Sequence, residues 1–208
     1  MIYEIRTYTL HPGKVRDYEA KFAESYPTRE KYSPLYGFWH TEIGPLNQLV
    51  HIWPYESLQH RADVRAASAK DPSGKWPPGA NEFASYQEND ILVPIPGMTE
   101  WQGPQKWGEL YELRMYTYPA GTIQEVAKGF SAALKGREAV YPVAGVWTSD
   151  LGNLNRLYQL FPYKDWAHRD QLRAEMRAKG IWPPHGESAH PMTQLVRHMV
   201  PAAYSPLH

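Results

Sequence analysis

The chain carries one sequence pattern twice, with an offset of 108 residues. Residues 3–65 align without a gap on residues 111–173, and 21 of those 63 positions are identical. Trp76-Pro77-Pro78 recurs as Trp182-Pro183-Pro184 after a slip of two residues. A repeat of this length is much longer than the unit of a solenoid, so each copy is expected to form a small domain with its own core. We expect a first domain over residues 1–95, a linker over residues 96–107 and a second domain over residues 108–208.

The composition is that of an ordinary globular protein, and it excludes several classes of function. The 208 residues have a formal charge of zero and a pI of about 7.1, so no basic excess is present for binding a nucleic acid. The apolar runs are short, and we expect neither a membrane span nor a signal peptide. The absence of cysteine excludes thiolate chemistry and disulfides, and it favours a cytoplasmic location.

Each copy is expected to fold in the order β-α-β-β-α-β. In residues 3–10 two kinds of side chain alternate, which is typical of a strand with two different faces. Apolar residues then recur at helical spacing from Lys14, and Pro27 is expected to end or kink this helix. Ser57 is expected to cap a second helix. The remaining expected elements are strands near residues 36–42, 48–53, 88–93 and 194–200 and helices over residues 57–70 and 165–179.

This order of elements is that of a ferredoxin-like unit, in which both helices cover one face of the sheet. The other face must be covered, and the equivalent sheet of the second copy is available to cover it. The expected fold class is therefore α+β, with two ferredoxin-like repeats packed sheet to sheet as an α/β barrel within one chain. Trp101 and Trp107 indicate that the linker packs on this barrel.

The opening strand of each copy places charged and phenolic side chains on one of its two faces. These residues are Glu4, Arg6 and Tyr8, repeated as Glu112, Arg114 and Tyr116. If the apolar face meets the helices, they point into the barrel. One interpretation is a structural Glu–Arg pair whose remaining partners are Tyr hydroxyls, because a buried charge needs a partner. The other is a wall that binds an anion or a carbonyl, in which Arg holds the ligand and Tyr donates a proton.

Two histidines break the repeat, because Thr148 and Gln159 stand where the first copy has His40 and His51. A turn at residues 43–47 would pair residues whose numbers sum to about 91, so the two histidines are expected to face each other across neighbouring strands. Such a pair can bind a metal or haem, act as a base, or be an ordinary hydrogen-bonded pair. No third ligand is apparent, so neither a metal nor a cofactor is predicted.

Tryptophans supply further candidates for the wall of a binding site. Trp39 and its counterpart Trp147 lie in expected strands, and each could either pack in the core or contact a ligand. Trp76 and Trp182 each begin a Trp-Pro-Pro loop, and rigid loops of this kind make lids over flat apolar ligands. The second loop leads into a segment expected in solvent that carries His185, Glu187 and His190.

Arginine pairs recur on the second helix of each copy. They are Arg61 and Arg65, and Arg169 and Arg173. Their spacing of four residues is typical of a solvated helix face, and an acidic partner or a ligand phosphate is the alternative.

Several long motifs resemble the NIPSNAP family. They are Tyr-Glu-Ile-Arg-Thr-Tyr-Thr-Leu-His-Pro-Gly-Lys at residues 3–14, Gly-Phe-Trp-His-Thr-Glu-Ile-Gly-Pro-Leu-Asn-Gln at 37–48, His-Ile-Trp-Pro-Tyr-Glu-Ser at 51–57 and Gln-Glu-Asn at 87–89. The second copy fits more loosely. The resemblance implies the dimeric α/β-barrel superfamily, whose other branches include cofactor-free monooxygenases, muconolactone isomerases and haem-dependent chlorite dismutases. It implies no reaction and no catalytic set, and animal members are associated with mitochondria.

The sequence therefore predicts a barrel that binds a small, flat, partly apolar molecule inside it. It leaves open whether the protein is an enzyme working without a cofactor. The alternatives are a non-catalytic interaction or scaffold protein and a haem-dependent oxidoreductase. The expected partners are the small-molecule ligand and further copies of the chain, which would form a homo-oligomer, and no nucleic acid.

Overall fold

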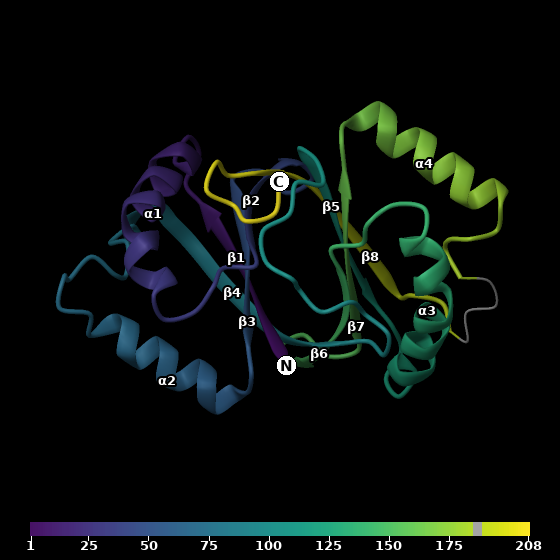
Figure 1. Ribbon diagram of the computed structural model, residues 1–208, viewed down its shortest axis with the longest axis horizontal. Helices are drawn as coiled ribbons and strands as arrows, with labels where there is room; N and C mark the ends of the chain where they lie inside the picture. The colour runs from purple at the N-terminus through teal and green to yellow at the C-terminus, as the bar shows by residue number, and fades with distance from the viewer. Residues whose placement is uncertain (185–188) are drawn as a thin grey trace.

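The two repeats share one closed β-barrel, flanked by a pair of helices on each side (Figure 1). The computed structural model describes residues 1–184 and 189–208. Within these residues the strand order around the barrel is β1-β3-β2-β8-β5-β7-β6-β4. The strands are β1 (Ile2–Leu10), β2 (Gly37–Ile43), β3 (Gln48–Tyr55), β4 (Ala84–Pro94), β5 (Leu110–Thr117), β6 (Gly145–Leu151), β7 (Arg156–Tyr163) and β8 (Thr193–Pro201).

The first repeat contributes α1 (Val15–Glu30) and α2 (Leu58–Ala69), and the second contributes α3 (Ile123–Glu138) and α4 (Trp166–Ala178). The expected cap at Ser57 is confirmed, because its Oγ accepts a hydrogen bond from the His60 amide at 3.1 Å. Asp165 caps α4 in the same way at 2.8 Å. The expectation that Pro27 ends this helix is wrong. Helix α1 runs through it to Glu30, since the side chains that follow Pro27 are buried against the body of the repeat.

Hydrogen bonds between the repeats close the barrel. Strand β2 pairs with β8, and β4 pairs with β6, so the edge strands of each four-stranded sheet are joined to the other sheet. Closure leaves no open sheet edge on the barrel, which satisfies backbone groups that would otherwise attract other chains. The predicted fold is confirmed: two ferredoxin-like repeats form an α/β barrel within one chain.

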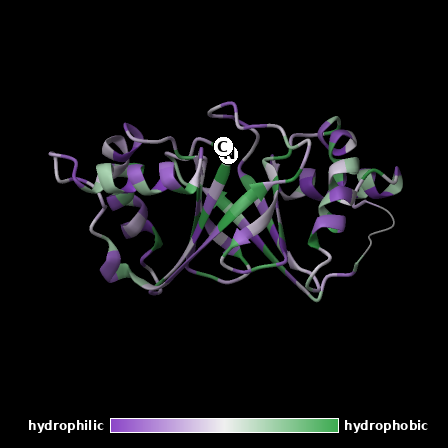
Figure 2. Cartoon of the chain, turned by 90° about the horizontal axis from the view of Figure 1, so that it is seen from below, coloured by the Kyte–Doolittle hydropathy of each residue, from purple (hydrophilic) through white to green (hydrophobic). Residues whose placement is uncertain are grey.

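The barrel interior is filled mainly by apolar side chains. Tyr3 and Ile5 of β1 point inward and join a buried cluster that includes Trp39, Trp147 and Met199. In Figure 2, hydrophobic residues concentrate on the strands that cross between the two helix pairs. Because the odd-numbered residues of β1 face inward, the even-numbered ones face the helices. The predicted direction of the charged face is therefore wrong, and the barrel encloses a packed core where a shared ligand chamber was expected.

The linker crosses one mouth of the barrel beside the C-terminal tail (Figure 1). The Gln105 amide donates to the Pro206 carbonyl of this tail, and the Gln105 carbonyl accepts from the His208 amide, both at 2.9 Å. Trp101 and Trp107 pack against the core of the barrel, so this segment lies on the body of the protein. Among the described residues, no helix is both long and apolar enough to span a membrane.

The tryptophans inside the barrel require glycine beside them. A methyl group added at Gly37 would overlap the indole of Trp39, which is fully buried and cannot move aside. We therefore expect Gly37→Ala to lower the free energy of unfolding by about 2–3 kcal/mol, as overpacked cores do. Urea denaturation followed by circular dichroism measures this change.

Gly129→Ala is the matched control. Gly129 lies in α3, and nothing stands within 4 Å of an added methyl group. Alanine there is expected to raise the free energy of unfolding by about 0.5–1 kcal/mol, because it favours the helix. Equal effects of the two substitutions would contradict the described packing of Trp39.

Candidate functional site

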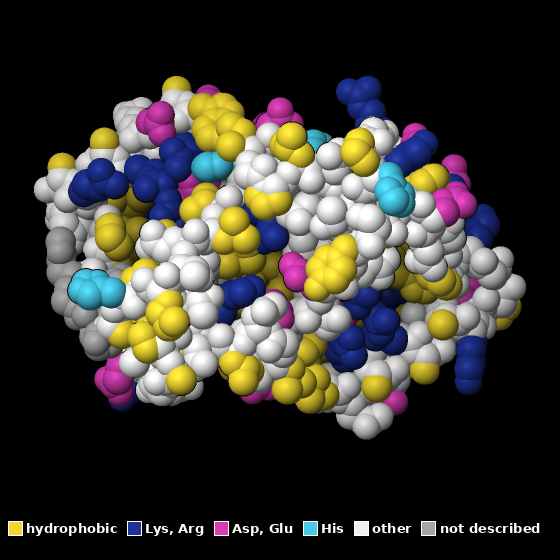
Figure 3. All heavy atoms as spheres, turned by 180° about the vertical axis from the view of Figure 1, so that it is seen from behind, with side chains coloured by type: hydrophobic (Ala, Val, Ile, Leu, Met, Phe, Trp, Pro, Cys, Tyr) yellow, Lys and Arg dark blue, Asp and Glu magenta, His cyan; other side chains and the backbone are white. Residues whose placement is uncertain are grey.

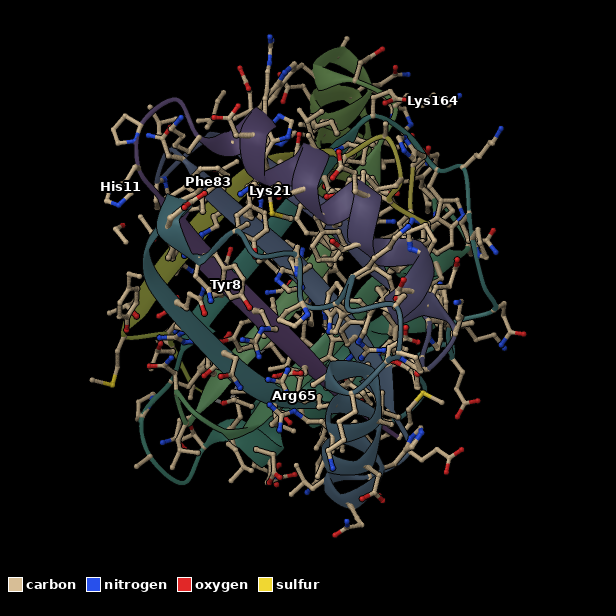
Figure 4. The ribbon with its side chains drawn as sticks, turned by 90° about the vertical axis from the view of Figure 1, so that its left-hand side faces the viewer. Tyr8, His11, Lys21, Arg65, Phe83 and Lys164 are labelled. Atoms are coloured by element: carbon tan, nitrogen blue, oxygen red, sulfur yellow. The ribbon has the colours of Figure 1, made fainter. Side chains whose placement is uncertain are left out.

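Each repeat contains a pocket between its sheet and its two helices. The volumes are about 270 Å³ in the first repeat (the first pocket) and about 280 Å³ in the second (the second pocket). Figure 4 looks onto the first repeat, with Tyr8 on β1 and Arg65 on α2. The equivalent lining residues of the two pockets are Arg6/Arg114, Tyr8/Tyr116, Phe22/Phe130, Arg29/Arg137, His51/Gln159, Trp53/Phe161, Tyr55/Tyr163, Arg65/Arg173, Trp76/Trp182 and Gln87/Gln194.

A buried glutamate lies beside the first pocket and holds several arginines. Glu4 is fully buried and accepts hydrogen bonds from Arg6 at 2.8 Å and from Arg61 at 2.6 Å, with Arg65 at 3.9 Å. Burial by itself would raise the pKa of Glu4, but the Arg61 hydrogen bond and the charges of the three arginines lower it below its ordinary value. The Glu–Arg pair predicted from the sequence is confirmed.

The second repeat repeats this network and adds a histidine. Glu112 accepts hydrogen bonds from Arg114, from Arg169 Nε at 2.6 Å, from Arg173 at 3.3 Å and from His198 Nε2 at 2.9 Å. Burial opposes the charge, yet the hydrogen bond from His198 and the charges of Arg114 and Arg169 lower the pKa of Glu112 well below its ordinary value.

The expected solvent exposure of the helix arginines holds for Arg65, whose side chain is 46% exposed, and is wrong for Arg61, Arg169 and Arg173. Arg61 and Arg169 lie mostly buried, with 23% and 17% of their side chains exposed, because they turn back to the glutamates. In each repeat the partner of this arginine is the buried glutamate of the same repeat, Glu4 for Arg61 and Glu112 for Arg169. Figure 3 shows Lys and Arg side chains gathered in two clusters, one on each half of the molecule.

A buried arginine without a carboxylate partner stands in each pocket. Arg29 donates to Ser33 Oγ at 2.8 Å and to Tyr55 Oη at 3.0 Å, and its guanidinium lies 4.4 Å from the Trp53 ring. No carboxylate among the described residues forms an ion pair with it. Burial lowers the pKa of Arg29. Keeping this arginine charged therefore costs free energy of desolvation, which a bound anion would offset.

Arg137 is the equivalent residue of the second repeat. It is fully buried, donates to the Tyr141 carbonyl at 2.6 Å and lies 5.1 Å from the Phe161 ring. Neither Arg29 nor Arg137 was among the candidate residues predicted from the sequence. Their identity at matching positions of the two copies was the available signal.

A buried nitrogen without a partner lines each pocket at the same position. His51 Nδ1 accepts from Trp53 Nε1 at 2.7 Å, so the proton of the neutral ring is on Nε2. Among the described residues Nε2 of His51 has no hydrogen-bond partner, and the same holds for Nε2 of Gln159. Burial and the nearby Arg6, Arg65 and Arg29 keep the pKa of His51 well below its usual value. His51 is therefore a neutral donor.

A tyrosine hydroxyl adds a second hydrogen-bond donor to each pocket. Tyr8 Oη accepts from Arg6 Nε at 2.7 Å, and Tyr116 Oη accepts from Arg114 Nη1 at 2.6 Å. Each hydroxyl proton is then free to be donated, since the oxygen is already used as an acceptor.

The predicted pairing of His40 with His51 is wrong. Phe38 stands opposite His51, because the hairpin register is two residues away from the expected one. His40 Nδ1 instead contacts Glu19 of α1 at 2.8 Å, and this hydrogen bond raises the pKa of His40. Within residues 1–184 and 189–208, no group of His, Asp and Glu is arranged to hold a metal ion.

The residues predicted to form one wall of a binding site lie in two separate parts of the structure. Trp39 and Trp147 lie inside the barrel, on the opposite side of the sheet from the arginines and tyrosines. Trp76 and Trp182 line the two pockets, where their rings lie 5.5 Å from Phe22 and 5.2 Å from Phe130. His190 is exposed, and His185 and Glu187 lie outside the described residues.

The network at Glu112 predicts acid sensitivity. Because its pKa is lowered on folding, its contribution is present above the ordinary glutamate pKa of about 4.3 and is lost as the pH falls further. Glu112→Gln should lower the free energy of unfolding by about 2–4 kcal/mol at pH 7, since it leaves clustered arginines without their anion. This deficit should shrink below pH ~4. Urea denaturation across a pH series measures both effects.

Glu125→Gln on the exposed face of α3 is the control, because Glu125 forms its one ion pair among the described residues with Lys128. It is expected to change the free energy of unfolding by less than about 0.5 kcal/mol. A Glu112 variant as stable as this control would show that the network contributes nothing.

Comparison with known proteins identifies relatives along the whole chain. The model of the NIPSNAP family matches residues 3–97 and 111–206. Human NipSnap homolog 3B is 30% identical over 216 residues, which cover 99% of this chain and 85% of that protein. Human NipSnap homolog 2 is 24% identical, over 99% of this chain and 74% of its own length.

A solved structure of a proposed monooxygenase from Lactobacillus acidophilus superposes with a TM-score of 0.65. It covers 97% of this chain and 93% of its own at 12% identity, which shows the shared fold alone. The family match spans both repeats, and the two relatives align with nearly the whole of this chain. The chain therefore belongs to the NIPSNAP family.

Proposed function

We propose that each of the two pockets binds a small, flat, partly apolar anion. The observation that carries this proposal is the excess of positive charge around a largely enclosed space. Arg6, Arg29, Arg61 and Arg65 surround or adjoin the first pocket, and Glu4 is the one carboxylate that pairs with them among the described residues. The second repeat has four equivalent arginines around Glu112, and one of them, Arg169, also pairs with the exposed Asp170.

The walls favour an aromatic or otherwise flat ligand. Phe22, Trp53 and Trp76 line the first pocket, and Phe130, Phe161 and Trp182 line the second. The volumes of about 270 and 280 Å³ lie just under the range of pockets for drug-sized molecules, so a ligand of one or two rings fits this space.

The donors suit an oxygen anion such as a carboxylate, a phenolate or an enolate. Arg29, Tyr8 and His51, whose side chains carry these donors, all belong to the lining of the first pocket. His51 does not act as a base here, because its Nδ1 lone pair is occupied by Trp53. If the bound molecule reacts, these residues supply stabilisation of an oxyanion, with Tyr8 as the proton donor, and they need no metal or organic cofactor for it.

An interaction or scaffold protein is the second candidate. The observation in its favour is the packed barrel, whose buried apolar cluster leaves the helix and hairpin surfaces available for contacts with other proteins. Leu46 and Leu154 at the hairpin tips are 63% and 59% exposed, which supports the predicted homo-oligomer. Light scattering on the purified protein tests the oligomer, and a monomer at every concentration would contradict it. The cytoplasmic location stays a prediction.

Benzoate and benzamide test the anion pocket, because they differ mainly in charge. We expect benzoate to raise the melting temperature and to bind at least about tenfold more tightly than benzamide by calorimetry, since the arginines favour the carboxylate. Arg65→Gln and Tyr8→Phe should each weaken binding to the first pocket about tenfold, the effect of removing a hydrogen bond to a charged group. Arg16→Gln on the exposed face of α1 is the control.

Equal affinity for the acid and the amide, or unchanged benzoate binding in both pocket variants, would contradict the proposal. Mass spectrometry of ligands released from native protein then identifies the natural class. An organic acid supports the anion pocket, a Soret band in the native protein supports the haem alternative, and the absence of any ligand favours the scaffold.

A further inference from the structure

A third pocket lies at the mouth of the barrel, beneath the linker. Its volume is about 290 Å³, and we call it the linker pocket. It is built from both repeats, because Tyr36 comes from the first, Glu138 ends α3 of the second, and residues 99–107 of the linker lie between them. The linker occurs once in the chain, so the internal repeat does not produce a second copy of this pocket.

The linker pocket has the opposite charge to the other two. Glu100 and Glu138 line it, and its described lining contains no lysine, arginine or histidine. The described linings of the first and second pockets contain arginines and no carboxylate. Glu138 accepts hydrogen bonds only from Thr99 among the described residues, at 3.3 and 3.4 Å, so its charge has no ion-pair partner there. A cation entering the linker pocket would find this carboxylate free.

Aromatic rings form the other walls. Tyr36, Trp101 and Trp107 all line the linker pocket. The rings of Tyr36 and Trp101 lie 5.5 Å apart at an angle of 44°, so they form two sides of a corner. Tyr36 is fixed in this position because it is fully buried and its hydroxyl donates to the Ala144 carbonyl. Trp101 is fixed by its packing on the barrel core.

Aromatic rings combined with carboxylates recognise organic cations. The negative face of an aromatic ring attracts a cation, and methylated ammonium groups are favoured because they lose little hydration on entering such a site. A metal ion would need several oxygen ligands at close range, and this pocket offers two separate carboxylates beside apolar walls. We infer that the linker pocket is a binding site for a small quaternary or methylated ammonium compound.

Choline and its uncharged carbon analogue 3,3-dimethylbutan-1-ol test this site, because they have nearly the same shape. Calorimetry should show choline binding at least about tenfold more tightly, owing to the attraction of its charge to the rings and carboxylates. The double variant Glu100→Gln and Glu138→Gln should weaken choline binding about fivefold or more, and Trp101→Leu should do the same. Glu100 is exposed and Glu138 is half-buried without an ion-pair partner among the described residues, so the double variant is expected to fold even if the tryptophan variant does not.

Glu125→Gln, on an exposed position of α3, is the matched control and should bind choline like the parent protein. Saturating benzoate should leave choline binding unchanged, because the anion pockets lie on the outer faces of the sheets. Equal binding of choline and the alcohol would show a simple apolar groove and overturn the inference. Unchanged choline affinity in the glutamate double variant, or competition by benzoate, would also overturn it.

Discussion

One buried carboxylate in each repeat determines where the positive charge of that repeat lies. Glu4 and Glu112 sit on the helix-facing side of the opening strands and draw arginines from the strand and from the second helix. One carboxylate cannot neutralise three or four guanidinium groups, so a surplus of positive charge stays beside the pocket. The same interaction that fixes helix to sheet therefore also prepares an anion site.

The duplication allows the two pockets to be compared within one molecule. His51 with Trp53 in the first becomes Gln159 with Phe161 in the second. The residue types change together, and in both cases one buried Nε2–H group remains without a partner among the described residues. The donor persists although the side chain that carries it differs. This persistence favours a function of the group beyond packing, since core packing alone is satisfied by apolar residues.

The sequence predicted the elements well because their signals are local. The spacing of apolar residues and the cap at Ser57 depend on neighbours within a few positions, and the internal repeat supports each element twice. The barrel followed from the uncovered sheet faces. The pairing of Glu4 with Arg6 was also predicted from the sequence, because a buried carboxylate needs a cation nearby.

The face of β1 that meets the helices could not be predicted in this way. Tyr3 and Ile5 suit a barrel core as well as a helix interface, and the choice depends on Arg61, which reaches Glu4 across 57 residues. The register of the β2–β3 hairpin also failed, since Thr41 Oγ1 bonds to Pro45 and Gln48 inside the turn and lengthens it. Arg29 was missed because its partner Tyr55 lies on a distant strand.

The most direct test of this account is a crystal structure of the protein soaked with 4-bromobenzoate, with the bromine located by its anomalous scattering. The account predicts one bromine site between sheet and helices in each repeat, with the carboxylate directed at Arg29 or Arg137. Bromine inside the barrel, among Trp39 and Trp147, would contradict it, and so would two empty pockets at concentrations that saturate binding in solution.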